Sequence, residues 1–320
     1  WGLKRKDQRL IEEARRLSKV AIVLVVTGVV SGTILAVQMP LMWPGLVEFG
    51  SKIIGLPFMF EGYMFLLEAL FLAFYVSTWG KIKGYKHWLL SLPIIIGSLG
   101  SAFFITTVNA WMQNPQGFDG VDAAGNLINP NIWQGIFTKT TFFMTSHSIL
   151  GYYATTFLLV AGGYCWYLLR KKPTGIDKKV SELIVYRFAL LSVLVGVVIG
   201  GIGHFNLQYL AQSQPHKFAA IELVPKTTIS APYTIGGRLS ESGDEVEGGI
   251  QIPKLLSVLT TNNPNGEVPG LDQTPKKDWP MLIIHTLFEI KMLLVGLMIL
   301  IPLAYVVSKR YFSKLASKKI

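Results

Sequence analysis

Two side chains that can bind a metal lie in separate apolar stretches of this 320-residue chain. His147 lies near the start of TTFFMTSHSILGYYATTFLLVAGGYCWYLL, and Met292 lies within MLIIHTLFEIKMLLVGLMILIPLAYVV. A histidine in such a stretch usually hydrogen-bonds to a neighbouring carbonyl or hydroxyl, and this interpretation is favoured for His147 alone. A methionine can, however, complete the axial coordination of a histidine-bound haem iron. The pair therefore predicts a haem that passes electrons, since iron with both axial positions filled does not readily bind oxygen.

Two carboxylates interrupt a further apolar stretch, IIGLPFMFEGYMFLLEALFLAFYVSTW. Glu61 and Glu68 are seven residues apart, or two helical turns, so they project from one face of a helix. Because acids are costly in hydrocarbon, such a pair usually faces a cavity, a proton path or a cationic partner. Hydrogen bonding between helices by protonated carboxyls is the structural alternative. We predict proton transfer, because two acids on one face are harder to explain by packing than one.

Membrane-spanning helices must position these residues. Hydrophobic residues make up 51% of the chain, charged residues 15%, and the mean hydropathy is +0.43, unlike an ordinary soluble domain. Stretches of roughly 20 apolar residues, enough to cross a bilayer, lie at about 18–37, 53–77, 88–110, 140–169, 184–212 and 281–307. We predict an all-α membrane protein with six transmembrane helices in a bundle and one long outside loop.

The distribution of positive charge predicts the orientation of these spans. The net charge is +11, but 20 of the 30 Lys and Arg residues lie on one side, at the two termini and in two connections. By the positive-inside rule, both termini are cytoplasmic and the long loop lies outside the plasma membrane. The charge is therefore a topology signal, and nucleic acid is not an expected partner.

Five segments follow from this topology, and the loop between the last two spans is the largest part outside the membrane. They are a charged juxtamembrane segment at 1–17, a five-helix region at 18–212, the external loop at 213–280, a sixth helix at 281–307 and a basic tail at 308–320. Long loops are usually functional or disordered. QSQPHKFAAIELVPKT is amphipathic, which argues against disorder, and GIQIPKLLSVL is apolar enough to lie on the membrane surface.

Other polar residues carry weaker signals. Trp111 fits the interfacial aromatic belt, and Gln113 adds an amide to a polar cluster at the same outer boundary. His87, next to the inner boundary, is typical of a surface residue. Cys165 is the only cysteine, which excludes an intrachain disulfide, a CxxCH haem attachment and a cysteine-ligated iron–sulfur cluster, so any haem is expected to be non-covalent. The chain begins at Trp1 with no signal-peptide pattern, and we expect further residues, including a helix, upstream.

Several tracts, taken in order, resemble subunit I of the cytochrome bd type of quinol oxidase. FEGYMFLLEALF resembles the helix with its two glutamates, and NAWMQNP resembles its most characteristic tract. SHSILGYYATT resembles the helix with the histidine of the low-spin b haem, KFAAIE and IQIP resemble the quinol-binding loop, and IKMLLVG resembles the helix with the methionine ligand. The likeness covers nearly all of the chain from the first span onward.

This resemblance implies the cofactor and the substrate. His147 and Met292 become the axial ligands of a low-spin haem b, and the tract with Trp111 and Gln113 is expected to contact a cofactor. Lys217 and Glu222 become residues of a quinol site. Their chemistry suits that role, because quinol oxidation releases protons and electrons, and needs a base, such as Glu222, and a hydrogen-bond donor, such as Lys217.

The chain also departs from the family pattern. The family's first helix and its last two helices, which supply ligands of the high-spin b haem and haem d, have no counterpart here, so those haems are not expected on this chain. Glu61 and Glu68 are one residue closer together than is usual in the family. Ile290, followed by Lys291, replaces an arginine that the family has two positions before the methionine. His285 is an alternative ligand to Met292, seven residues earlier on the same face.

Three functions remain open at this point. The chain is expected to be a quinol-oxidising, haem b subunit of a cytochrome bd-like complex, with oxygen reduced only if a second membrane subunit completes the site. Alternatively, it exchanges electrons with quinone in another membrane complex without oxygen chemistry. The third function is that of a haem-free structural or proton-channel subunit that uses Glu61 and Glu68.

Overall fold

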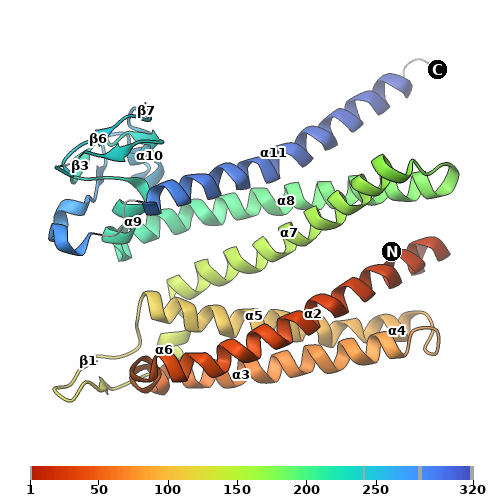
Figure 1. Ribbon diagram of the computed structural model, residues 1–320, viewed down its shortest axis with the longest axis horizontal. Helices are drawn as coiled ribbons and strands as arrows, with labels where there is room; N and C mark the ends of the chain where they lie inside the picture. The colour runs from red at the N-terminus through yellow and green to blue at the C-terminus, as the bar shows by residue number, and fades with distance from the viewer. Residues whose placement is uncertain (1, 241, 280–282, 318–320) are drawn as a thin grey trace. The chain divides into compact units, whose positions relative to one another are not determined.

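Long helices occupy the predicted spans. The computed structural model describes residues 2–240, 242–279 and 283–317. Within these ranges, six helices are long and apolar enough to cross a membrane. They are α2 (Gln8–Met42), α3 (Pro44–Ser77), α5 (Ser91–Gln113) with the short α4 (Tyr85–Leu89) before it, α7 (Lys139–Lys171), α8 (Gly175–Ser213) and α11 (Ile283–Ser317) (Figure 1). The prediction of an all-α membrane fold that crosses the bilayer several times is confirmed.

The first span begins earlier than hydropathy indicated. After α1 (Gly2–Arg5), α2 starts at Gln8, because the Asp7 side chain accepts hydrogen bonds from the backbone N–H groups of Arg9 and Leu10 and so caps the helix. Much of the predicted 1–17 segment is therefore continuous with the first span. Parts of four predictions lie outside the described residues: Trp1 of the first segment, Glu241 and Pro280 of the external loop, residues 281–282 of the sixth helix and residues 318–320 of the basic tail.

The chain forms two compact units, one up to Ile149 and one from Leu150. In the first unit, α3 packs closely against α5, because small residues of α5 let the backbones approach. A Cβ atom on Gly97 would lie 2.7 Å from backbone atoms of Met64 and Glu68. This contact holds the glutamate-bearing face of α3 against α5.

One end of the first unit has its own buried core. Ile53 and Ile54 of α3 pack there with Val108 and Trp111 of α5. The connection from α5 to α7 covers this end with a short hairpin of β1 (Gly120–Val121) and β2 (Leu127–Ile128), followed by α6 (Ile132–Ile136). This core fixes the position of the NAWMQNP tract.

His87 is buried at the other end of α3, although its place in the sequence predicted a surface residue. Its Nε2 donates a hydrogen bond to the carbonyl of Tyr75 at 2.7 Å, and its ring stacks on the Tyr75 ring with centroids 4.4 Å apart. A carbonyl in the last turn of a helix lacks an intrahelical donor, so His87 supplies one. The prediction of a surface position is wrong.

In the second unit, α8 and α11 run side by side, and the 213–280 segment forms a small folded region at one end of them (Figure 1). Its helices are α9 (Pro215–Glu222), α10 (Leu255–Thr261), η1 (Leu271–Gln273) and η2 (Lys276–Asp278). Its strands pair antiparallel: β3 (Thr228–Ile229) with β8 (Glu267–Val268), β4 (Tyr233–Ile235) with β7 (Ile250–Ile252), and β5 (Arg238–Leu239) with β6 (Val246–Glu247). We call this segment the external fold.

A hydrophobic core explains why the external fold is ordered. Phe218 and Ala219 of α9 are fully buried, together with Leu256 and Val268, and Ala211 from the end of α8 belongs to the same cluster. The tract GIQIPKLLSVL, predicted to lie on the membrane surface, divides between two roles. Its first part forms the exposed strand β7, and its second part, including Leu256, enters the core.

Because α3 packs closely on α5, one methyl group added at this contact is expected to destabilise the protein. Gly97→Ala is expected to lower the stability of the purified protein by about 1–3 kcal/mol, because the new Cβ overlaps backbone atoms that cannot move aside. Gly62→Ala, on the same pair of helices but with no atom within 4 Å of the added Cβ, is the control and is expected to be neutral or mildly stabilising. Thermal unfolding in detergent measures both, and equal midpoints for the two variants would contradict the packing described here.

Candidate functional site

Among the described residues of the external fold, Glu222 is the most deeply buried carboxylate, with 5% of its surface exposed. It is the last residue of α9, and the next residue, Leu223, has φ = 56°, in the left-handed region. A leucine tolerates this conformation only when its surroundings enforce it. Leu223 is itself buried in the core, so the packing that holds Leu223 also ends α9 at Glu222.

Three ionisable groups from other elements surround the Glu222 carboxyl. Burial, the largest cause, and the negative charge of Glu289 together raise its pKa to about 7, while the positive charge of Lys291 acts in the opposite direction. Tyr233 of β4 lies close enough that its own pKa is raised by burial and by the charges of Glu222 and Glu289. At neutral pH, Glu222 is therefore poised between its protonated and ionised forms.

Two side chains of α11 bind the external fold next to Glu222. His285 is 3% exposed, and its Nδ1 donates a hydrogen bond to the carbonyl of Ile221 at 2.6 Å. Glu289, one turn further along α11, accepts a hydrogen bond from the backbone N–H of Gly236 at 2.6 Å. The two side chains also touch each other, with 3.5 Å between Nε2 of His285 and Oε1 of Glu289. The carboxyl end of α9 and the end of β4 are thus fixed to one helix.

Lys217 does not share this environment with Glu222. The two residues are five positions apart on α9, which places their side chains about 140° apart around the helix. Partial burial lowers the pKa of Lys217, but the cation whose charge acts on Glu222 is Lys291 of α11. The sequence analysis named Lys291 only as a neighbour of Met292. Its proximity to Glu222 comes from the docking of α9 on α11 and has no local signal in the sequence.

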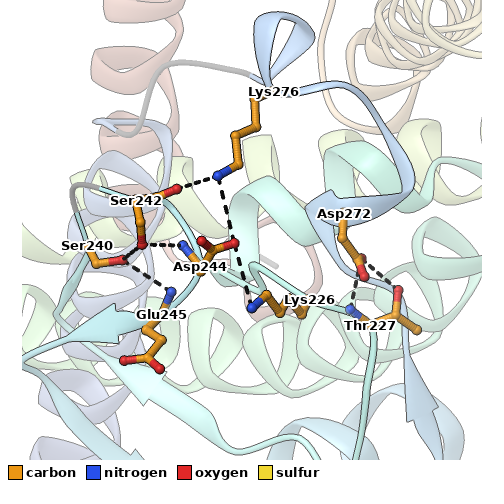
Figure 2. A network of polar contacts seen from close by, with 8 residues as sticks. All are labelled: Lys226, Thr227, Ser240, Ser242, Asp244, Glu245, Asp272 and Lys276. Atoms are coloured by element: carbon orange, nitrogen blue, oxygen red, sulfur yellow. Dashed lines mark hydrogen bonds and ion pairs between the residues drawn. The ribbon is translucent and has the colours of Figure 1, made fainter.

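A polar network ties down the segment that leads from the external fold into α11 (Figure 2). Lys226 and Lys276 both approach Oδ1 of Asp244, at 3.6 and 3.7 Å, and Lys276 also donates a hydrogen bond to the carbonyl of Ser242. Nearby, Asp272 accepts two hydrogen bonds from Thr227, at 2.9 Å each. These exposed pairs contribute little stability one by one, but together they close the segment onto the fold.

The two predicted iron ligands each stand beside an open stretch of helix. His147 belongs to the first unit and Met292 to the second, and both side chains are exposed on this chain. Gly151 follows His147 by four residues, and Gly296 follows Met292 by the same interval, so each glycine lies on the same face as its ligand. A Cβ atom at either glycine would have no atom within 4 Å among the described residues. A flat macrocycle fits against such bare helix faces, and the donor atoms suit a haem iron.

His285 does not fit the role of alternative iron ligand. Its Nδ1 is bound to the carbonyl of Ile221 in the external fold, and its Nε2 faces Glu289 of α11 itself, so both ring nitrogens point at protein atoms. Met292 keeps an accessible sulfur, with 46% of the residue exposed. Of these two side chains of α11, Met292 is therefore the one that remains accessible.

Comparison with known proteins identifies the family. The model of the cytochrome bd terminal oxidase subunit I family matches residues 1–318. The chain belongs to this family.

The relatives and a solved structure agree with this assignment. A putative cytochrome bd menaquinol oxidase subunit I of Bacillus subtilis (strain 168) is 32% identical over 97% of this chain and 70% of its own length. A cytochrome bd-II ubiquinol oxidase subunit 1 of Escherichia coli (strain K12) is 28% identical over 80% of this chain and 49% of its own length. The structure of bd oxidase from Geobacillus thermodenitrificans matches with a TM-score of 0.88 at 31% identity, over 97% of this chain and 70% of that chain. The chain thus spans from about half to 70% of the length of these proteins.

Family membership confirms the resemblance that the sequence tracts indicated, and the structure locates the remaining predicted residues. Glu61 accepts a hydrogen bond from the Ser101 hydroxyl of α5 at 3.1 Å. Glu68 lies against Gly97, further along the same contact between α3 and α5. Both residues are partly buried and lie against the same neighbouring helix, as their spacing of two turns predicts.

The NAWMQNP tract plays a structural part in the first unit. Trp111 is 2% exposed, packs on Gly50, and donates its indole N–H to the carbonyl of Gln116 at 2.9 Å. It is therefore a core residue, and its assignment to the lipid-facing aromatic belt is wrong. Gln113 is exposed and donates a hydrogen bond to the Asn109 side chain at 2.6 Å. Of the two predicted cofactor contacts, only Gln113 presents its side chain at the surface of this chain.

The environment of Glu222 predicts a titration that can be observed directly. Its carboxyl is expected to be protonated below pH 7 and ionised above it, where an ordinary glutamate titrates near 4.5. Infrared difference spectra between wild type and Glu222→Gln, recorded across pH, would show the protonated carboxyl band fading with a midpoint near 7. Asp122 serves as an internal control: the backbone N–H of Asn126 lowers its pKa, so Asp122→Asn should change nothing in this range. A Glu222 midpoint near 4.5 would contradict the burial.

Proposed function

We propose that this chain oxidises a quinol at the outer face of the plasma membrane and passes the electrons to a low-spin b haem held by His147 and Met292. The layout of α11 carries the proposal. Glu289, whose charge acts on the buried Glu222, lies three residues before Met292, about 4.5 Å along the helix axis. One helix therefore carries, within a single turn, an iron ligand and a residue whose charge acts on the proton-accepting Glu222.

The proton chemistry belongs to Glu222. Quinol oxidation needs a base that is ionised at working pH and can still hold a proton once it has accepted one, which a carboxyl with a pKa of about 7 provides. The positive charge of Lys291 acts on Glu222 and offsets the charge of the ionised form. Lys217, on another face of α9, is placed to donate a hydrogen bond to the quinol from outside the buried cluster. A quinol entering between them would lose its protons on the side of the external fold.

His147 and Met292 would hold the haem, which would supply one-electron chemistry when bound. Reduction of oxygen needs further haems, and we propose that a second membrane subunit or other parts of the complex supply their ligands. The orientation follows from the positive charge: both termini are cytoplasmic and the external fold lies outside. Protons from quinol would then be released on the outer face.

We also assign proton transfer within the first unit to Glu61 and Glu68. Both are held on the face of α3 that meets α5, where the hydroxyl of Ser101 provides Glu61 with a hydrogen-bond donor. Acids inside a membrane bundle usually mark a proton path, and their shared face supports a common path for these two. Their separation of two turns, about 10 Å along the axis, requires water or another group between them.

The haem assignment predicts the loss of one optical signal. His147→Ala and Met292→Ala are each expected to abolish the low-spin b band in the reduced-minus-oxidised spectrum of the purified complex, because each removes an axial ligand. Met298→Ala is the matched control, a partly exposed methionine on the same helix, and should leave the band intact. An unchanged band in both ligand variants would remove the basis of the assignment. A far-red haem d band in the wild-type complex would support oxygen reduction by the assembly.

The base assignment predicts a catalytic defect without loss of haem. Glu222→Gln is expected to reduce quinol oxidation on the order of 100-fold, because the amide cannot accept the proton. In the wild type, turnover should rise with pH through a midpoint near 7, since only the ionised carboxylate accepts a proton, and Glu222→Gln should lack this limb. Glu247→Gln, at an exposed carboxylate of the same external fold, is the control. Undiminished turnover in Glu222→Gln would refute the role.

A further inference from the structure

Two backbone points of the external fold are fixed by side chains from α11, and both points adjoin the Glu222 site. The carbonyl that His285 binds belongs to Ile221, the residue before Glu222. The N–H that Glu289 binds belongs to Gly236, the residue after β4, whose first member Tyr233 lies next to Glu222. The pair of α11 side chains therefore determines where α9 and β4 stand relative to the helix that carries Met292.

The local backbone is arranged to make these contacts. Gly236 has φ = 73°, a conformation that favours glycine, and this turn directs its N–H toward Glu289. Strand β4 is held in register by β7, which is formed by the first three residues of the IQIP tract, through the pairs Tyr233 with Ile252 and Ile235 with Ile250. The IQIP tract thus supports the strand whose end Glu289 binds. The IQIP tract is exposed and has no evident contact with the site, but its pairing with β4 gives it a structural role.

Hydrogen-bond chemistry makes the pair of side chains act as one unit. A carbonyl only accepts, so the hydrogen on the His285 ring must be at Nδ1, and Nε2 of the neutral ring is then an acceptor. Nε2 has no hydrogen-bond partner in the described part of the chain apart from its 3.5 Å contact with Glu289. Oε1 of Glu289 is the atom that meets both groups: it accepts the hydrogen bond from the Gly236 N–H and lies 3.5 Å from Nε2 of His285.

We propose that Glu289 and His285 are the positioning residues of the quinol site, and that they hold α9 and β4 on α11 so that Glu222 lies beside the iron-bearing turn of that helix. This inference rests on the proposed quinol oxidation for its functional readout, but the contacts themselves can be tested without it. Neither residue touches the reacting quinol in this scheme. Their loss is expected to loosen the site while the haem ligand stays in place.

Two substitutions at Glu289 distinguish the loss of its hydrogen bond to Gly236 from the loss of its negative charge. Glu289→Ala removes the acceptor for the Gly236 N–H, and should raise the KM for quinol about tenfold, the effect of losing one charge-assisted hydrogen bond, with a smaller change in kcat. Glu289→Gln should restore most of the KM, because its amide oxygen can still accept the hydrogen bond from the Gly236 N–H. His285→Asn should likewise be milder than His285→Leu, since asparagine can still donate to the Ile221 carbonyl.

Hydrogen exchange gives the readout that does not depend on turnover. In the intact complex, the Gly236 amide should be protected in the wild type and in Glu289→Gln, and should exchange about tenfold faster in Glu289→Ala. Glu247→Gln, an exposed carboxylate on β6, is the control and should leave Gly236 protected. The low-spin b spectrum should be retained in every variant, which shows that the complex is folded.

The outcomes distinguish this inference from the proposed function. Wild-type KM together with wild-type protection of Gly236 in Glu289→Ala would overturn the positioning role, even if Glu222→Gln is inactive. Unimpaired turnover in Glu222→Gln would overturn the quinol assignment, and the exchange of Gly236 would still decide whether Glu289 holds the external fold. A KM as high in Glu289→Gln as in Glu289→Ala would show that the charge, and not the hydrogen bond, is what matters, and would also overturn the proposal.

Discussion

The burial of the Glu222 carboxyl against α11 is the constraint on which the second unit depends. Burying a carboxylate is costly, and the cost is reduced only if the group holds a proton or finds a cation close by. Both provisions come from α11, where Glu289 favours the protonated form and Lys291 favours the ionised one. A site balanced in this way releases and accepts protons near neutral pH. It exists only while α9 is seated on α11.

That seating depends on a small hydrophobic core outside the membrane. Ala219 and Ala220 allow α9 to approach its neighbours closely, and Phe218 fills the space beneath them. The core also includes residues from the distant β8 and η1, so chain segments separated by some fifty residues must assemble before α9 has a surface to rest on. The polar network around Asp244 then closes the last segment before α11 begins. Local helix propensity alone would not hold an eight-residue helix.

The sequence predicted the spans well because hydropathy over about 20 residues depends on composition and not on tertiary contacts. It did not predict the external fold, whose strands are two or three residues long and pair across long separations. It also grouped Lys217 with Glu222, although five residues along a helix turn two side chains to different faces. The pair His285 and Glu289 had a readable signal, since ionisable residues four apart in an apolar span rarely lack a partner. What they bind, two backbone groups of the external fold, required the structure.

The same reasoning separates the two carboxylate sites of the chain. One charge near Glu222 favours its protonated form and another favours its ionised form, so Glu222 suits a reaction that delivers a proton to it. Glu61 and Glu68 lie along a helix contact where Met64, between them on the same face, packs on Gly100 and fills the space with an apolar side chain. A direct hydrogen bond between these acids is excluded by two turns of helix, and Met64 interrupts the shortest route. A proton path through them therefore has to pass along the edge of the α3–α5 contact, where Ser101 supplies the one hydroxyl seen bonded to Glu61 among the described residues.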